Sequence, residues 1–109
     1  MKYRHYCPKC ETALFKRDDY NKAQALYDEY ESKGLRPCFM CDEAAAKNIK
    51  GNVLSLGKTA EEIAFNLYDK LHEGEETADL LIAFEVDTGS DVDVGIMNRL
   101  SKACKKYET

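Results

Sequence analysis

The feature that most constrains the fold of this chain is a regular alternation between short apolar runs and amphipathic stretches. The clearest apolar run is 79–86, whose centre reads LLIAF without a polar residue. Strands that are buried on both faces read in this continuous way, whereas half-exposed strands alternate apolar and polar residues. A sheet that contains such a strand needs cover on both faces, which helices provide in α/β proteins.

Four strands and four helices alternate in this interpretation. The predicted strands are 12–16, 35–41, 53–56 and 79–86. Asp18 and Asp19 can cap a first helix, which has its apolar residues three and four apart and ends at Gly34. The repeated order of strand and helix predicts an α/β domain with a mainly parallel sheet of four to five strands, flanked by helices.

The remaining helices have recognisable starting signals. Asp42 can cap a brief helix over 43–47, and Thr59 with Glu62 forms a capping box for a longer one. We expect His72 to end that exposed helix and to interact with its dipole. The last helix is predicted to begin near Asp91 or Asp93, and its inward residues are Ile96, Leu100, Ala103 and Tyr107.

Composition limits the classes of function. The chain has 109 residues, of which 44% are hydrophobic and 33% charged, so it can close one hydrophobic core. No apolar run reaches the roughly 18–20 residues that cross a bilayer, and the polar, basic N-terminus is unlike a secretory signal. A net charge of −4 gives no general reason to expect nucleic-acid binding. Five cysteines without a secretory signal favour reduced thiols or a metal, so we expect a cytoplasmic protein.

Two CxxC pairs suggest a zinc site. Cys7 with Cys10 and Cys38 with Cys41 could supply four thiolates to a tetrahedral ion. However, residues three apart on a strand point to opposite faces of the sheet, and 35–41 is a predicted strand. We favour the strand interpretation and expect no zinc. A free-standing four-cysteine zinc module remains the alternative hypothesis.

Two short motifs and the histidines carry little weight as catalytic signals. The GKT at 57–59 resembles the end of a phosphate-binding loop, but asparagine stands at the position of the first glycine. The DTG at 87–89 copies an aspartic-protease triplet in a chain too helical for that class, so we interpret it as a turn. His5 and His72 are the only histidines, and neither has a partner that would complete a catalytic set.

The first ten residues are dense in cationic and aromatic groups. Arg4, His5 and Tyr6 stand among two lysines and a further tyrosine. Such groups can hold phosphate oxygens and stack on a base, although many terminal segments are simply solvated tails. Both interpretations stay open on the residues alone.

Several segments resemble one known family. MKYRHYCPK at the start resembles the linker of the two-domain, YrdC-type L-threonylcarbamoyladenylate synthases, which reads GMKYRHYAPK, and GIMNRLSKA at 95–103 resembles that family's AIMNRLRKA. LSLG at 54–57 and IAFNLY at 63–68 are similar to two further segments between them. The resemblance therefore extends over the whole chain.

This resemblance implies a C-terminal accessory domain with a Rossmann-like, three-layer fold at 11–109, preceded by a linker arm at 1–10. In the family, an N-terminal nucleotidyltransferase domain joins threonine, bicarbonate and ATP into threonylcarbamoyl-AMP, with Mg and with release of pyrophosphate, for threonylcarbamoyladenosine modification of tRNA. The chain would then begin within the linker, lack the catalytic domain and be inactive alone. Its implied partners are that domain and other tRNA-modification proteins, without a membrane or direct contact with nucleic acid.

The resemblance also suggests roles for individual residues. The family's linker folds over the mouth of the catalytic site, so Arg4, His5 and Tyr6 would lie nearest to nucleotide or intermediate. Asn98 and Arg99 match the family motif without an assigned role. Alanines usually replace the first CxxC cysteines in the family, and a Gly-x-Gly loop replaces 91–93, where Asp91 and Asp93 would repel an anion.

Overall fold

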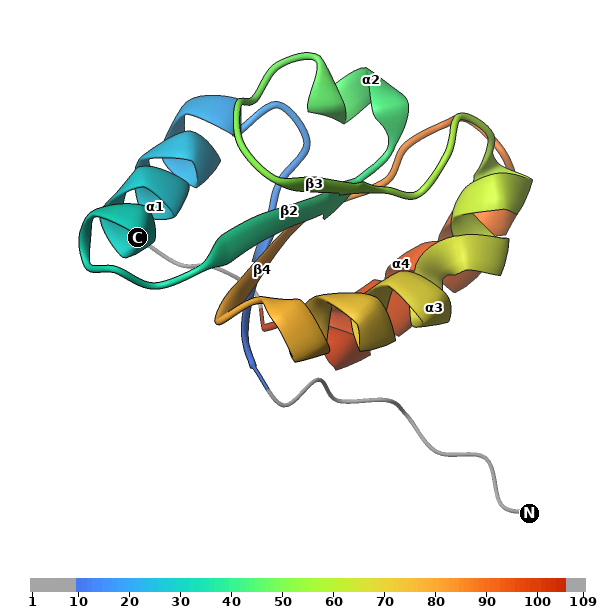
Figure 1. Cartoon of the computed structure of the whole chain (residues 1–109). Helices are drawn as coiled ribbons and strands as arrows, with labels where there is room; N and C mark the ends of the chain where they lie inside the picture. Colours follow the sequence, from blue (N-terminus) through green and yellow to red (C-terminus); the bar gives the residue numbers. More distant parts are fainter. Residues whose placement is uncertain (1–9, 106–109) are drawn as a thin grey trace.

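Four short apolar segments form a single sheet in the computed structural model of this chain, which describes residues 10–105 (Figure 1). The strands are β1 (Glu11–Phe15), β2 (Pro37–Cys41), β3 (Val53–Ser55) and β4 (Leu80–Phe84). They lie in the order β1-β4-β2-β3, and every neighbouring pair is parallel. The two central strands, β2 and β4, are buried along their whole length. Their continuous apolar sequences follow from this double burial.

The helices cover both faces of the sheet. α1 (Tyr20–Ser32) and α2 (Glu43–Ala46) lie on one face, and α3 (Ala60–Thr77) and α4 (Val92–Ala103) lie on the other (Figure 1). The predicted three-layer α/β fold with a parallel sheet of four to five strands is confirmed, with four strands in the described residues.

Alternation along the central strands divides the core into two halves. Leu81 packs on the α3–α4 face with Ile63 and Leu100, whereas Ile82 packs on the α1–α2 face with Tyr27. Phe39 stacks on the Tyr27 ring, with ring centroids 4.8 Å apart. Both helical layers pack on the same strands, and each covers an apolar face of the sheet that would otherwise be exposed to water.

The predicted helix starts are confirmed at two positions. The Thr59 hydroxyl accepts a hydrogen bond from the Glu62 amide, and the Glu62 carboxylate accepts one from the Thr59 amide. Asp42 caps α2 by accepting from the Ala45 amide. Asp19 stands at the N-cap of α1 but its side chain accepts no capping bond, and Asp91 makes none at α4.

The ends of the described chain lie side by side. After α4, the Lys105 amide donates to the Thr12 hydroxyl and the Lys105 carbonyl accepts from the Leu14 amide, both at 2.8 Å. The chain that follows α4 therefore begins along the outer edge of β1. Tyr107, predicted to point inward, lies outside the described residues. Over 10–105, no helix combines the length and the apolarity needed to span a membrane.

Candidate functional site

The carboxyl ends of the parallel strands meet at one edge of the sheet, where α/β proteins commonly bind ligands. Arg17 follows β1, Asp42 follows β2 and Glu85 follows β4. The Arg17 guanidinium donates to the Asp42 carboxylate and to the Glu85 carbonyl, with both distances 3.3 Å. One side chain thus joins three strand ends and occupies the space between them.

Asp42 is the one buried charged residue that the structure shows between residues 10 and 105, with 5% of its surface exposed. One carboxylate oxygen caps α2 and the other pairs with Arg17. A buried charge needs this pairing because desolvation otherwise disfavours it. Both oxygens are committed to the fold, so Asp42 is not placed to act as a general base.

The loop after β4 is fixed by a carboxylate from the first turn of α4. Asp93 accepts hydrogen bonds from the Thr88 amide and hydroxyl, both at 2.7 Å, and from the Gly89 amide at 3.1 Å. These donors, the Thr88 hydroxyl foremost, lower the pKa of the Asp93 carboxyl. The N–H groups that could hold an external anion are therefore occupied by the chain's own carboxylate.

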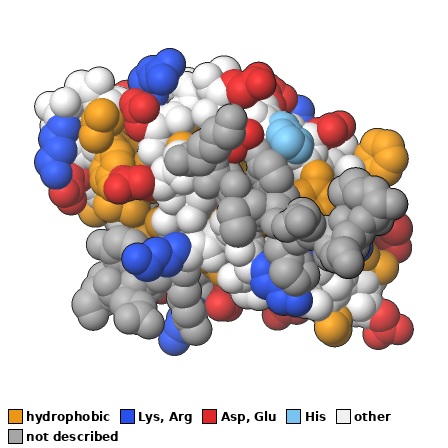
Figure 2. Space-filling view, turned by 90° about the horizontal axis from the view of Figure 1, so that it is seen from below, with side chains coloured by type: hydrophobic (Ala, Val, Ile, Leu, Met, Phe, Trp, Pro, Cys, Tyr) orange, Lys and Arg blue, Asp and Glu red, His pale blue; other side chains and the backbone are white. Residues whose placement is uncertain are grey.

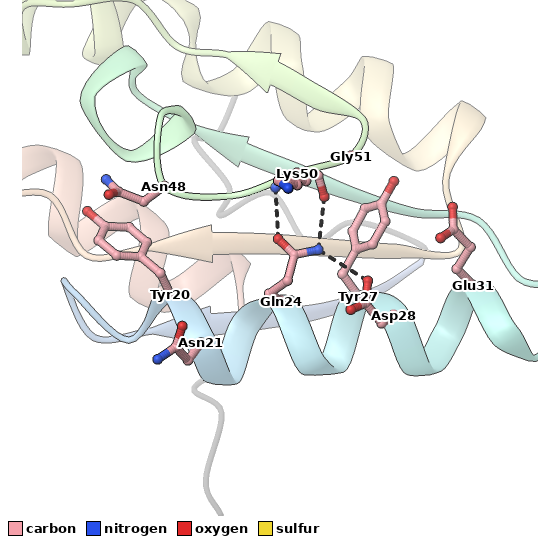
Figure 3. A pocket seen from close by; sticks show the side chains of 9 residues that line it. All are labelled: Tyr20, Asn21, Gln24, Tyr27, Asp28, Glu31, Asn48, Lys50 and Gly51. Atoms are coloured by element: carbon pink, nitrogen blue, oxygen red, sulfur yellow. Dashed lines mark hydrogen bonds between the residues drawn. The ribbon is translucent and has the colours of Figure 1, made fainter.

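An open cavity of about 530 Å³ lies between α1 and the loop that precedes β3 (Figure 3). The Gln24 side chain spans this gap, because its Nε2 donates to the Lys50 carbonyl at 2.9 Å and its Oε1 accepts from the Lys50 amide at 2.8 Å. The lining residues are Tyr20, Asn21, Gln24, Tyr27, Asp28, Glu31, Asn48, Lys50 and Gly51.

The central polar groups of this cavity hold the fold together. The Tyr27 hydroxyl accepts from the Asn52 amide at 2.8 Å and lies against Gly51, which has a φ of 137° and no room for a side chain. The polar groups of Gln24 and Tyr27 bind to the loop before β3 and hold it against α1, so they are not free to bind a ligand in the cavity. The cavity thus offers a ligand mainly exposed polar groups at its rim.

The cysteines of the second CxxC pair point to opposite faces of β2, as the strand interpretation predicted. Cys38 packs in the α3–α4 half of the core and Cys41 in the α1–α2 half. Burial raises the pKa of the Cys38 thiol to about 11 and that of Cys41 to about 12. Cys10 and Cys104 lie on the α3–α4 side, and burial raises the pKa of both thiols, to about 12 for Cys104.

This arrangement does not support the zinc alternative. Two thiols on opposite faces of one strand cannot join a single tetrahedral site. Across residues 10–105, no group of three or more Cys, His, Asp or Glu side chains is arranged to hold a metal ion. Cys7 lies outside the described residues.

The other predicted site residues fall into two groups. Asn98 and Arg99 lie on the exposed side of α4, so the structure separates them from the carboxyl edge and from the cavity. Arg4, His5 and Tyr6 lie outside the described residues. His72 does not end its helix, because α3 continues to Thr77, and its Nδ1 lies 3.7 Å from the Glu75 carboxylate.

Two central features of these sites were absent from the sequence interpretation. The partner of Asp42 is Arg17, which stands 25 residues away, and Gln24 holds a loop 26 residues away. Neither contact follows from a short-range pattern in the sequence.

On the face that Figure 2 shows, cationic and acidic side chains are interspersed.

Comparisons with known proteins agree on one relationship. Residues 1–104 match the family described as "Threonylcarbamoyl-AMP synthase, C-terminal domain". The threonylcarbamoyl-AMP synthase of Bacillus subtilis (strain 168) is 37% identical over 108 residues, which cover 94% of this chain. The chain spans 30% of the length of the curated relatives that it matches.

Solved structures show the same fold. Sua5 from Pyrococcus abyssi, crystallised with L-threonine, is similar with a TM-score of 0.73 and 29% identity, over 99% of this chain and 33% of that one. The C-terminal Sua5 domain of a Pyrococcus horikoshii protein has a TM-score of 0.63 and 23% identity, over 93% of this chain and all of that one.

Proposed function

The chain belongs to the family of C-terminal domains of threonylcarbamoyl-AMP synthases, and from this premise we propose that it serves as the accessory domain of such a synthase. The catalytic partner is a YrdC-type nucleotidyltransferase domain. That domain joins threonine, bicarbonate and ATP, with Mg, into threonylcarbamoyl-AMP and pyrophosphate for tRNA modification. The accessory domain holds no cofactor of its own, and the pair works in the cytoplasm together with other tRNA-modification proteins.

The observation that carries this proposal is that the polar side chains at the carboxyl edge of the sheet bind to one another and to the backbone of the same domain. Arg17, Asp42 and Asp93 bind to partners within the domain at the edge where a ligand would bind. The thiols of Cys38, Cys41 and Cys104 have raised pKa values that disfavour the reactive thiolate. A domain of this kind contributes by binding and positioning rather than by bond-making.

The arm at residues 1–10 is the part that we place near the chemistry. Arg4 can hold phosphate oxygens through its guanidinium, while His5 and Tyr6 can donate hydrogen bonds to the nucleotide or to the acyl-adenylate. Closing the site over this labile intermediate keeps water away from it. The domain at 11–109 supports the arm by fixing the point where the arm joins the domain.

A chimera tests this role directly. The C-terminal domain of the Bacillus subtilis synthase is replaced by this chain, and formation of threonylcarbamoyl-AMP from threonine, bicarbonate and ATP is measured. Arg4→Ala is expected to slow product formation about tenfold or more, in line with the loss of a charge-assisted phosphate contact. Lys22→Ala, an exposed change on α1, is the matched control. An Arg4→Ala chimera as fast as its parent would refute the arm's role.

A further inference from the structure

We propose that the outward side of α4 is the surface through which this domain docks against the catalytic domain, on a partner surface that carries carboxylates. The proposal rests on the proposed function, because that function supplies the occupant. It gives a role to Asn98 and Arg99, which the domain's own fold leaves exposed.

This surface, the α4 ridge, is defined by Val94, Gly95, Asn98, Arg99 and Lys102. Their spacing of three and four residues places them on one side of the helix. Ile96, Leu100 and Ala103 are buried on the opposite side, so the ridge faces away from the sheet. Val94 is 75% exposed, a large value for an apolar side chain. The ridge thus combines an apolar end, a central amide and a cationic end, without a carboxylate among its members.

The cations of the ridge are unpaired among residues 10–105. Arg17, Arg36 and Lys70 each make an ion pair in the domain. By contrast, neither Arg99 nor Lys102 bonds to a described side chain. Lys102 lies in the last turn of α4, where a cation interacts favourably with the helix dipole. This interaction is confined to the last turn, so it does not explain the presence of Arg99.

Gly95 shapes the ridge. The Arg99 guanidinium lies back along the helix, with one nitrogen 3.9 Å from the place where a Cβ of Gly95 would stand. Because Gly95 has no side chain, the surface beside this guanidinium nitrogen is left open to a partner's carboxylate. Planar, two-point contacts are the strong form of arginine recognition.

The position of the ridge puts it near the point where the arm joins the domain. The hydrogen bond from Lys105 to Thr12 places the end of α4 beside the start of β1, where residues 1–9 join at Cys10. Nine residues extend at most about 30 Å, so a catalytic site covered by the arm lies within that distance of Cys10. Helix α4 is about 18 Å long and falls wholly within this range. The whole ridge is therefore within reach of a domain that the arm tethers at Cys10.

Charge favours a protein partner over nucleic acid. The chain carries a net charge of −4, and the ridge offers two cations, which is few for binding a polyanion. Complementary charges of this number are typical of the rim of a protein interface, where they set orientation and association rate.

The test measures binding of this chain to a separately produced YrdC-type catalytic domain by calorimetry at low and moderate salt. We expect R99E/K102E to bind about tenfold more weakly than the unchanged chain, and R99Q/K102Q to show a smaller loss. K22E/K47E makes the same charge change at an exposed residue of α1 and at the exposed residue that follows α2, and it is expected to bind as the unchanged chain does. Circular dichroism confirms that each variant folds.

Each outcome separates the two proposals. Binding that is lost on R99E/K102E and kept on K22E/K47E supports the ridge. Equal binding by all variants overturns the ridge and leaves the accessory function standing. No binding by the unchanged chain overturns the ridge, and an inactive chimera overturns the accessory function as well. Binding of the unchanged chain to tRNA through Arg99 and Lys102 instead would replace the protein partner with a nucleic acid.

Discussion

The Arg17 guanidinium meets the Asp42 carboxylate at 3.3 Å, which joins the ends of β1 and β2 across the intervening β4. Arg17 also donates to the carbonyl of Glu85, the residue that follows β4. The carboxyl edge of this sheet is the usual ligand crevice of α/β folds. In this domain an internal ion pair joins the strand ends at that edge, which supports the proposed accessory role.

Replacing Asp42 tests this closure. Asp42→Ala removes both the cap of α2 and the partner of Arg17, so we expect a loss of about 1–3 kcal/mol in the free energy of unfolding. Asp42→Asn keeps an oxygen for the cap and is expected to lose less. Chemical denaturation measures both, with the exposed neighbour Glu43→Ala as control. An Asp42→Ala chain as stable as its parent would show that the pair contributes nothing.

The two helix glycines are expected to respond in opposite directions. A Cβ on Gly74 would stand 2.5 Å from the tip of Leu81, which is fully buried and cannot move aside freely. We expect Gly74→Ala to destabilise the fold by about 1–3 kcal/mol through overpacking. A Cβ on Gly95 would make only an ordinary contact, 3.9 Å from an Arg99 guanidinium nitrogen, so Gly95→Ala should be neutral or stabilising by up to about 1 kcal/mol. Thermal unfolding compares them, and equal effects would contradict the packing of α3 on β4.

Thiol reactivity tests the placement of the cysteines. In a Cys7→Ser background, Cys41 and Cys104 should react with Ellman's reagent at pH 8 roughly 10³-fold more slowly than free cysteine, since their pKa values of about 12 leave little thiolate. Cys10, which is only partly buried, should react first of the four. The unfolded chain is the control. Four fast thiols in the folded chain would contradict the buried positions.

The loop bound by Asp93 gives a pH-dependent signal. Because its folded pKa is lowered, the carboxylate stabilises the fold above its ordinary pKa of about 3.9, and this contribution is lost as the pH falls through the lower folded value. The Thr88 amide resonance should therefore titrate below pH 3.9 in NMR spectra. Asp93→Ala should abolish that titration and speed hydrogen exchange at Thr88 and Gly89. A titration at or above the ordinary value would contradict the three hydrogen bonds.

The sequence predicted features that arise from local patterns. The uninterrupted run at Leu80–Phe84 indicated a strand buried on both faces, and Thr59 with Glu62 indicated a capping box. The opposite orientations of Cys38 and Cys41 followed from strand geometry alone.

Long-range relationships were beyond such patterns. The insertion of β4 between β1 and β2 depends on how whole layers pack, and several strand orders satisfy the same alternation. The bond from Arg17 to Asp42 depends in turn on that order. The last helix was predicted to begin near Asp91 or Asp93, but nothing in the sequence indicated that the Asp93 carboxylate binds to the preceding loop at Thr88 and Gly89.

The measurement that tests the central claim most directly is product formation by three proteins at equal concentration. These are the Bacillus subtilis synthase, its catalytic domain alone, and the chimera that carries this chain as its C-terminal domain. The account predicts that the chimera forms threonylcarbamoyl-AMP at least about tenfold faster than the catalytic domain alone, because the arm and its supporting domain close the site. A folded chimera no faster than the catalytic domain alone would contradict the account.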